Sequence, residues 1–206
     1  MKVTDHKQKT RQQPAQQVRI IGGQWKRTPL PVAHVEGLRP TPDRVRETAF
    51  NWIGHQLGGN WQRVRCLDLF AGSGALGFEA ASRGAAQVTL VEASPEAWRN
   101  LETIKTKLDA GQVTIVRGDA LRFAQMAAGN GQRFDVIFLD PPYQADLLPK
   151  ILPLCADLLA EDGLVYAESA QPFDRRDGET APEFLAGWEI IRSDHAGMVF
   201  YCLLKR

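Results

Sequence analysis

The residue pattern with the clearest chemical meaning is Asp140-Pro141-Pro142-Tyr143, which directly follows an apolar run. Two consecutive prolines fix φ and remove two N–H donors, so the backbone there presents carbonyl acceptors. Asp140 and the Pro141 carbonyl can accept the two N–H groups of an exocyclic base amine, and Tyr143 offers a ring face for stacking a flipped base. When such an amine is the acceptor in an in-line methyl transfer, positioning of this kind supplies much of the rate. We predict that these four residues form the catalytic set, against the alternative of a proline turn that merely ends a strand.

A second pattern lies upstream, where an apolar run enters a glycine-rich turn. Gly72, Gly74 and Gly77 satisfy the G-x-G-x-x-G spacing of dinucleotide-binding folds. Glu92 lies 20 residues after Gly72, and a carboxylate there can accept both hydroxyls of a ribose. The glycine pattern alone therefore leaves a nicotinamide or flavin enzyme as a competitor.

Asp68 and Phe70 shift that balance. Asp68 lies four residues before the first glycine, and a carboxylate there would repel a pyrophosphate but attract a cofactor with an amino group and a sulfonium cation. Phe70 adds bulk where a pyrophosphate must approach the backbone. Asp119 is placed to accept from an adenine amino group; the alternatives are an exposed helix cap for Asp119 and a solvated Glu92. The predicted cofactor contacts are Asp68, Phe70, Gly72, Gly74, Glu92, Asp119 and Ala120.

The two patterns need a scaffold that brings them together, and the rest of the chain predicts one. Strand candidates alternate with helix candidates, which predicts a parallel sheet covered by helices on both faces. The expected strands are 64–70, 87–92, 113–117, 134–139 and 163–168, and the expected helices are 75–83, 95–109, 119–128 and 146–160. The short connection between 188–193 and 198–204 allows only an antiparallel hairpin. The predicted fold class is α/β, a mostly parallel sheet with an antiparallel C-terminal hairpin.

The N-terminal third carries most of the basic charge. Residues 1–65 hold 12 Lys and Arg against 4 Asp and Glu, a net of +8, whereas residues 66–206 hold 13 against 20, a net of −7. This asymmetry favours an anionic polymer that docks at one end, against the alternative of a solvated basic tail without a partner. We expect a β-hairpin from strands 18–21 and 24–30, then a helix over 42–54 capped by Thr41.

A domain organisation and a set of nucleic-acid contacts follow from this asymmetry. We predict a flexible basic arm over residues 1–16, an RNA-binding N-terminal extension of hairpin and helix over 17–60, and a cofactor-binding catalytic domain over 61–206. The cations suited to RNA phosphates are Arg19, Lys26, Arg27, Arg39, Arg44 and Arg46. Arg44 and Arg46 leave a helix at different angles, so one can face RNA while the other pairs with Glu47 or Asp43.

Composition argues against several other kinds of site. The chain has three cysteines and four histidines, none with metal-ligand spacing, so we expect no metal, and thiols buried in a reducing compartment. No apolar run approaches the length of a membrane span, and the polar N-terminus lacks the apolar stretch of a signal peptide. We therefore expect a cytoplasmic protein that does not engage membranes.

The ordered motifs resemble those of the class I methyltransferases that modify exocyclic amines: Asp68-Leu-Phe-Ala-Gly-Ser-Gly74, Glu92, Asp119 and Asp140-Pro-Pro-Tyr143. Two further segments, Arg19 to Arg27 and Leu38 to Ile53, resemble the opening of a narrower family, the RsmD type, whose bacterial members make N2-methylguanine in 16S ribosomal RNA. The resemblance spans about residues 18–206. It implies a seven-stranded Rossmann-like core, S-adenosylmethionine as methyl donor, and an assembled small ribosomal subunit as substrate.

By position, the resemblance also implies cofactor contacts at Asp68, Gly72, Glu92 and Asp119, and target-base contacts at Asp140 and Tyr143. The sequence departs from the commoner Asn-Pro-Pro-Tyr at Asp140. Asp in this place also occurs in adenine-N6 DNA enzymes, so the motif alone leaves the base open. The leading hypothesis is guanine-N2 methylation of 16S ribosomal RNA, and the alternative is a DNA or RNA adenine-N6 methyltransferase.

Each rival function needs a feature that the sequence does not favour. A DNA adenine-N6 enzyme usually needs a sizeable target-recognition insertion, for which 206 residues leave no room, whereas RNA can be recognised by shape. A protein-glutamine methyltransferase would have little purpose for the basic segment. A NAD-dependent oxidoreductase has no use for Asp68 and the catalytic set, and an intact catalytic set also argues against a non-catalytic RNA-binding module.

Overall fold

The computed structural model describes residues 17–32, 41–173 and 182–206 of the chain. Its centre is a seven-stranded sheet of order β5-β4-β3-β6-β7-β9-β8. The strands are β3 (Arg65–Asp68), β4 (Gln87–Glu92), β5 (Val113–Arg117), β6 (Phe134–Leu139), β7 (Leu159–Ser169), β8 (Glu189–Ala196) and β9 (Val199–Lys205). β3 to β7 pair in parallel, and β9 is antiparallel to both of its neighbours. The predicted α/β fold with an antiparallel C-terminal hairpin is confirmed.

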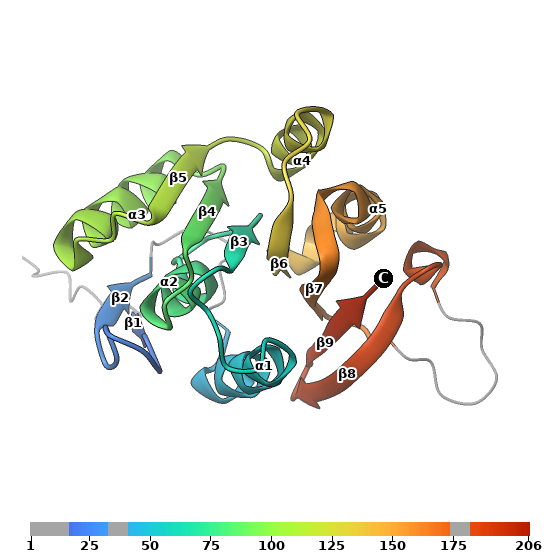
Figure 1. Ribbon diagram of the computed structural model, residues 1–206, viewed down its shortest axis with the longest axis horizontal. Helices are drawn as coiled ribbons and strands as arrows, with labels where there is room; N and C mark the ends of the chain where they lie inside the picture. The colour runs from blue at the N-terminus through green and yellow to red at the C-terminus, as the bar shows by residue number, and fades with distance from the viewer. Residues whose placement is uncertain (1–16, 33–40, 174–181) are drawn as a thin grey trace, which may run out of the picture.

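Alternation along the strands divides the sheet into two apolar faces. In β6, Val136 and Phe138 join one buried cluster, whereas Ile137 and Leu139 join the other, because side chains alternate across a pleated strand. The first face is covered by α1 (Asp43–Gln56), α2 (Ala75–Ser82) and α3 (Pro95–Leu108), and the second by α4 (Ala120–Gly129) and α5 (Leu148–Leu158) (Figure 1). Two short 3-10 turns, η1 (Tyr143–Ala145) and η2 (Glu183–Leu185), lie in the loops. Within the described ranges, no helix is long and apolar enough to cross a membrane.

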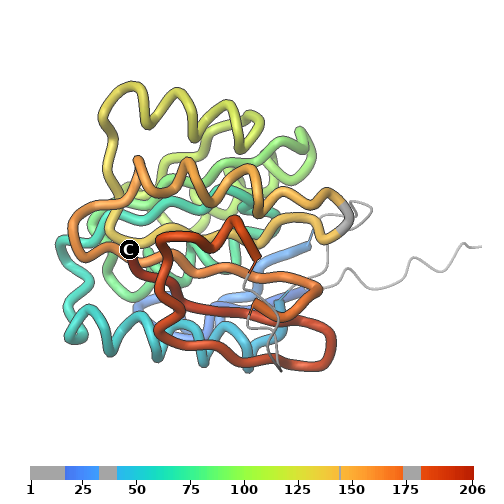
Figure 2. The backbone as a smooth tube through the Cα atoms, turned by 90° about the vertical axis from the view of Figure 1, so that its right-hand side faces the viewer, coloured from blue at the N-terminus to red at the C-terminus, as the bar shows by residue number. Residues whose placement is uncertain are grey.

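The N-terminal extension packs into the same core as the sheet. β1 (Gln17–Arg19) and β2 (Pro29–Pro31) form a small antiparallel pair. Val18, Ile20 and Leu30 belong to the buried cluster that α1 and α2 cover, and the pair lies against the body of the molecule (Figure 2). The extension therefore shares its hydrophobic core with the catalytic part of the chain.

The loop between β1 and β2 is not the strand predicted over residues 24–30. Gln24 N donates to the Ser82 carbonyl at 2.8 Å, and Trp25 N donates to Ser82 Oγ at 2.9 Å. Arg27 adopts a left-handed φ of 72°, which a strand does not allow. Gln24 N and Trp25 N bond to the end of α2 and do not pair across the hairpin, whereas Arg27 N still donates to the Ile20 carbonyl at 2.8 Å.

The junction of α5 and β7 also differs from the prediction. The helix ends at Leu158, and the strand begins at Leu159, four residues before the expected start. The pairing with β6 shifts register between Phe134 and Val136, and Asp162 has a φ of 60°. A bulge therefore extends the strand into residues that the sequence pattern predicted to be helical.

Candidate active site and basic surface

The two sequence motifs meet where the strand order reverses. β3 lies between β4 and β6, and its register places Asp68 opposite Phe138. Leu69 N donates to the Phe138 carbonyl at 3.2 Å, and Ala71 N donates to the Val91 carbonyl at 3.0 Å. The glycine turn after β3 and the catalytic set after β6 therefore emerge side by side at the carboxyl edge, where open α/β sheets bind ligands.

Glu92, at the end of β4, closes the glycine turn. It accepts hydrogen bonds from Gly72 N and Ser94 N, both at 2.7 Å. Burial raises the pKa of its carboxyl, although the backbone donors oppose this shift. Gly74 precedes α2 with a φ of 78°, and a Cβ there would lie 2.5 Å from Phe78 Cδ2, so the turn requires glycine. Glu92 is thus bound to the turn rather than simply solvated.

Asp68 lies beneath this turn with 1% of its surface exposed. It accepts hydrogen bonds from Phe70 N at 3.3 Å and from Gly77 N at 3.2 Å. Burial raises its pKa to about 7, and the negative charges of Asp140 and Glu92 add to this effect. A cation at this edge would favour the ionised carboxyl. This buried carboxyl therefore suits a cofactor that carries a sulfonium and an ammonium group.

Asp119 and Ala120 follow β5 at the start of α4, next to the end of β4. The Asp119 side chain is exposed, and its Oδ1 accepts from Arg122 N at 2.9 Å, so it caps the helix. Ala120 is buried, and the half-buried Phe70 packs against the second apolar cluster. The predicted cofactor residues therefore gather at three adjacent strand ends, while their contacts with a cofactor stay predictions.

The catalytic set begins directly after β6. Asp140 is half-buried, and its Oδ2 accepts from Thr41 Oγ1 at 3.0 Å. Burial raises the pKa of Asp140 to about 6, and the bond from Thr41 acts in the opposite direction. Pro141 is buried, Pro142 is exposed, and the half-buried Tyr143 opens the turn η1. The catalytic set therefore has one acidic group, Asp140, at the edge of the site. Its carboxyl ionises close to neutral pH.

Sequence reasoning missed the polar residues behind this set. Glu168 in β7 is 1% exposed; its Oε1 accepts from the Tyr166 hydroxyl at 2.8 Å and lies within hydrogen-bond distance of Thr41 Oγ1, at 3.1 Å. A side-chain hydrogen bond with Tyr143 also acts on it. Burial raises its pKa well above the ordinary value, and the charge of Asp140 adds to the shift. We name Thr41, Asp140, Tyr143, Tyr166 and Glu168 the Glu168 cluster.

The predicted helix cap at Thr41 is wrong. α1 begins at Asp43 after Pro42, and no side chain caps it. The Thr41 hydroxyl instead bonds to Asp140 and Glu168. A hydroxyl that reaches two buried carboxyls is satisfied there, so the first turn of α1 is left without its cap.

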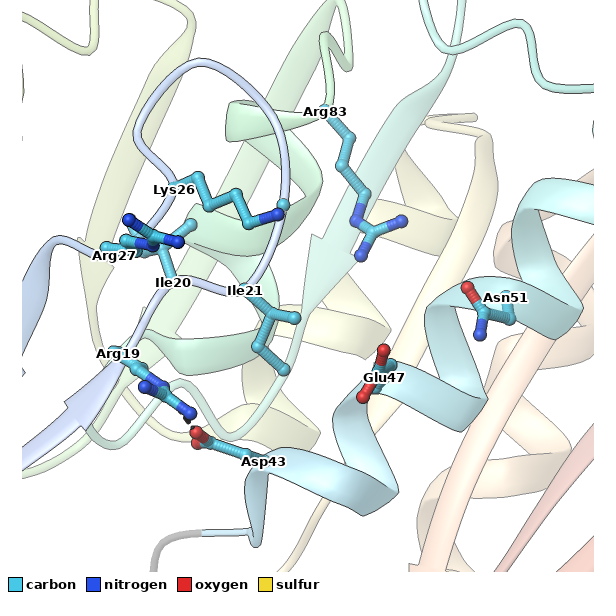
Figure 3. A pocket seen from close by; sticks show the side chains of 10 residues that line it. Arg19, Ile20, Ile21, Lys26, Arg27, Asp43, Glu47, Asn51 and Arg83 are labelled. Atoms are coloured by element: carbon cyan, nitrogen blue, oxygen red, sulfur yellow. Dashed lines mark hydrogen bonds and ion pairs between the residues drawn. The ribbon is translucent and has the colours of Figure 1, made fainter.

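Three of the predicted RNA-binding residues surround a cavity of about 450 Å³ between the hairpin loop and α1. Arg19, Lys26 and Arg27 lie on one side of it, with Arg83 above and the acidic Asp43 and Glu47 on α1 (Figure 3). Arg19 Nε donates to Asp43 Oδ2 at 2.7 Å. The cavity therefore offers cations from β1, from the hairpin loop and from the residue that follows α2, partly balanced by the acids of α1.

The remaining predicted cations behave differently from one another. Arg44 is exposed, and its charge acts on Asp194 of β8. Arg39 lies outside the described residues. Arg46 has no exposed surface and donates from Nη2 to Asp43 Oδ1 at 2.6 Å. The prediction that Arg46 contacts RNA is therefore wrong, and the pairing with Asp43 that the sequence left open is the one found.

The Rossmann-like sheet, with a glycine turn after β3 and the catalytic set after β6, defines the class I methyltransferase architecture. A protein-family model described as "Conserved hypothetical protein 95" matches residues 18–205. The chain belongs to this family, the RsmD type, as its motifs predicted. The match includes the extension as well as the sheet.

Relatives in this family are similar over nearly their whole length. Ribosomal RNA small subunit methyltransferase D of Escherichia coli K12 is 42% identical over 92% of this chain and 90% of that protein. The protein of the same name in Haemophilus influenzae is 37% identical over 92% of this chain and 94% of its own. The solved structure of the yhhF protein of Escherichia coli superposes with a TM-score of 0.74 at 41% identity, covering 93% of this chain and 98% of that one.

Proposed function

We propose that the protein transfers a methyl group from S-adenosylmethionine to the exocyclic N2 of a guanine in 16S ribosomal RNA. Membership of the family supports S-adenosylmethionine-dependent methylation of ribosomal RNA. The relatives from Escherichia coli and Haemophilus influenzae are named for the small-subunit RNA. The choice of an exocyclic amine, and of guanine N2 in particular, goes further and rests on the catalytic set and the extension.

The position of Asp140 is the observation that carries this proposal. It stands at the end of β6, beside the turn that follows β3. Its Oδ2 accepts from Thr41, which fixes the carboxyl plane, and its Oδ1 serves with the Pro141 carbonyl as acceptor for the two amine N–H groups. Hydrogen bonds to both N–H groups favour a pyramidal nitrogen whose lone pair points at the methyl carbon. Alignment of this kind supplies much of the rate.

The residues around the glycine turn hold the cofactor. When bound, S-adenosylmethionine supplies an electrophilic methyl group next to a positive charge. Asp68 balances that charge from beneath the turn, and Glu92 accepts from the ribose hydroxyls at the end of β4. Asp119 accepts from the adenine amino group at the end of β5. Tyr143 stacks against the flipped base, since aromatic faces bind any base by stacking.

The basic surface supplies the contacts to the RNA backbone. Arg19, Lys26 and Arg27 gather around the cavity of the extension, and Arg44 lies exposed at the other side of α1. Phosphate contacts position a nucleic acid without reading its sequence, which suits a folded RNA recognised by shape. We place the reaction on the assembled small subunit in the cytoplasm, without a metal.

The test uses purified protein, tritiated S-adenosylmethionine and small ribosomal subunits from cells that lack the enzyme, with DNA as the comparison substrate. Digestion and chromatography then assign the label to a nucleoside. Label in N2-methylguanosine of 16S RNA is the expected result. Label in N6-methyladenosine would support the alternative function, and no label in either nucleic acid despite measured cofactor binding would overturn the proposal.

A further inference from the structure

The Glu168 cluster joins parts of the chain that are far apart in sequence. Thr41 lies 99 positions from Asp140 and 127 from Glu168, yet its hydroxyl oxygen is 3.0 Å from one carboxyl and 3.1 Å from the other. Thr41 itself is buried at the start of the segment that leads into α1. A single hydroxyl from the extension therefore bridges two acids of the catalytic edge.

A proton on one of the two acids allows both contacts of this bridge to be full hydrogen bonds. A threonine hydroxyl has one hydrogen, so it donates to one acceptor at a time. A carboxylate has no hydrogen to donate. If Thr41 donates to one acid, the second short contact is a hydrogen bond only when the other acid donates its own proton to Thr41 Oγ1.

Burial identifies Glu168 as the acid that holds this proton. Glu168 is 1% exposed, whereas Asp140 is half-buried at the edge of the site, and burial opposes the charged form of a carboxyl. The pKa of Glu168 is raised further by the charge of Asp140, while the hydrogen bonds from Tyr166 and Tyr143 oppose the shift without cancelling it. The neutral form of Glu168 donates to Thr41, and Thr41 then donates to Asp140.

The other groups that face Glu168 are compatible with this arrangement. The charge of Arg46 in α1 interacts with Glu168, but its Nη2 and Nε donate to Asp43 and to the Thr41 carbonyl, and its buried Nη1 has no hydrogen-bond partner among the described residues. Tyr166 stands on the same strand, with Tyr201 of β9 beyond it at a ring distance of 6.4 Å. Asp43 therefore offsets the nearest buried cation, so that Glu168 does not need to be ionised to balance it.

We propose that Glu168 is a positioning residue for methyl transfer. In its neutral form it donates to Thr41, so that the Thr41 hydroxyl points at Asp140, and it also bonds to Tyr143. Asp140 then stays ionised, with its Oδ1 toward the target amine. This inference rests on the proposed function. Thr41 acts in the same chain of hydrogen bonds, so the extension takes part in orienting the catalytic set.

Substitution of Glu168 tests the proton directly, because glutamine has the shape of a neutral carboxyl and its amide nitrogen can donate to Thr41 Oγ1, with the Tyr166 hydroxyl accepting the second N–H. Glu168→Gln should keep kcat within about threefold of the wild type. Glu168→Ala should lower kcat roughly a hundredfold by misplacing Asp140 and Tyr143, with the dissociation constant for S-adenosylmethionine unchanged by calorimetry. Equal losses in the two variants would overturn the proposal, as would wild-type kcat in Glu168→Ala.

The pH profile separates a neutral from a charged Glu168. The wild-type rate should fall as pH drops through about 6, because Asp140 takes up a proton. Glu168→Gln should leave this fall in rate at the same pH, since one neutral group replaces another. A fall displaced by about one pH unit to lower pH would show that Glu168 had been charged and would overturn the assignment.

A second pair of variants keeps the test valid if Glu168→Ala fails to fold. Thr41→Val removes the hydroxyl at constant shape and should lower kcat as Glu168→Ala does, whereas Thr41→Ser restores the hydroxyl and should recover most of it. Equal kcat in these two variants would overturn the proposal that the Thr41 hydroxyl links Glu168 to Asp140.

Infrared spectroscopy tests the proton without an activity assay. The unliganded protein should show a protonated-carboxyl band that Glu168→Gln removes, at a pH above the range in which Asp68 and Asp140 ionise. Absence of that band would overturn the proton assignment. A wild-type protein that shows the band but methylates no RNA would overturn the proposed function instead.

Discussion

The glycine turn and the N-terminal extension both reach the catalytic edge, but they are held in different ways. In the turn, Asp68 bonds to the backbone of Phe70 and Gly77, two and nine positions further along the chain. In the extension, the polar contacts span long separations, such as 58 positions between Ile21 and Glu79. The turn is therefore a local structure that its own sequence specifies. The extension has internal pairing as well, but its hairpin loop is held by contacts with α2, far along the chain.

Glu79 shows how strong that dependence is. It is fully buried in α2, and it accepts from Ile21 N at 2.6 Å, from Gly22 N at 2.8 Å and from Arg83 Nε at 2.8 Å. Ser82, one turn further on, donates to the Gly22 carbonyl at 2.6 Å. One face of α2 therefore binds the hairpin loop, while its N-terminus carries the glycine turn.

The largest expected effect separates the base site from the cofactor site. Asp140→Ala should lower turnover roughly a hundredfold to a thousandfold, because it removes the acceptor that orients the amine. The affinity for S-adenosylmethionine, measured by calorimetry, should stay close to that of the wild type. Asp140→Asn is the matched control, since it keeps one acceptor and should retain more activity. Turnover of Asp140→Ala at the wild-type rate would refute the role of Asp140.

The next effect tests whether the extension depends on the sheet. Glu79→Ala leaves the part-buried N–H groups of Ile21 and Gly22 and the Arg83 guanidinium without their acceptor, so it should lower the free energy of unfolding by about 3 kcal/mol. Urea unfolding followed by circular dichroism measures this. The exposed Glu161→Ala is the control and should change stability little. Similar stabilities for the two variants would mean that the hairpin is held by its apolar contacts alone.

A smaller effect tests the basic surface of the extension. The double change Lys26→Ala and Arg27→Ala should weaken binding to the small subunit and reduce the slope of log affinity against log salt by about 2. Changing Arg99 and Lys107 together, one Arg and one Lys exposed on α3, removes the same charge elsewhere and should leave the slope near that of the wild type. Identical slopes for both double variants would remove Lys26 and Arg27 from the interface.

The smallest effect concerns the charge beneath the glycine turn. Binding of a cationic cofactor should release a fraction of a proton near neutral pH, because it lowers the pKa of Asp68 from about 7. Calorimetry in two buffers with different ionisation enthalpies measures this release, which should fade at more alkaline pH, where Asp68 is already ionised. Proton uptake on binding would contradict this account of Asp68.

The same contrast explains what the sequence could predict. The glycine turn and the catalytic set were predictable because the residues of each motif lie within ten positions of one another, and a strand-turn pattern fixes their edge of the sheet. Thr41 and Glu168 were not, since their contact spans 127 positions. Glu168 did have a local signal, because it lies two positions after the buried Tyr166 in β7 and therefore on the same face of the strand.

Arg46 had a signal as well. It lies four and seven residues before Phe50 and Ile53, and this spacing places it on the apolar face of α1. Charge alone led to its assignment as a phosphate contact. Periodicity would have predicted its burial, although not its pairing with Asp43, which is also the partner of Arg19.

The packing of α1 against the C-terminal strands also affects how the chain matures during its synthesis. Trp52 of α1 lies with its ring 5.4 Å from that of Tyr201 in β9, and Thr41 bonds to β7. On a translating ribosome the extension emerges well before either partner has been made. The final structure of the extension must therefore form late, because it depends on contacts between residues far apart in the sequence, which form slowly. Until then its apolar residues are exposed on the nascent chain, where chaperones can bind them.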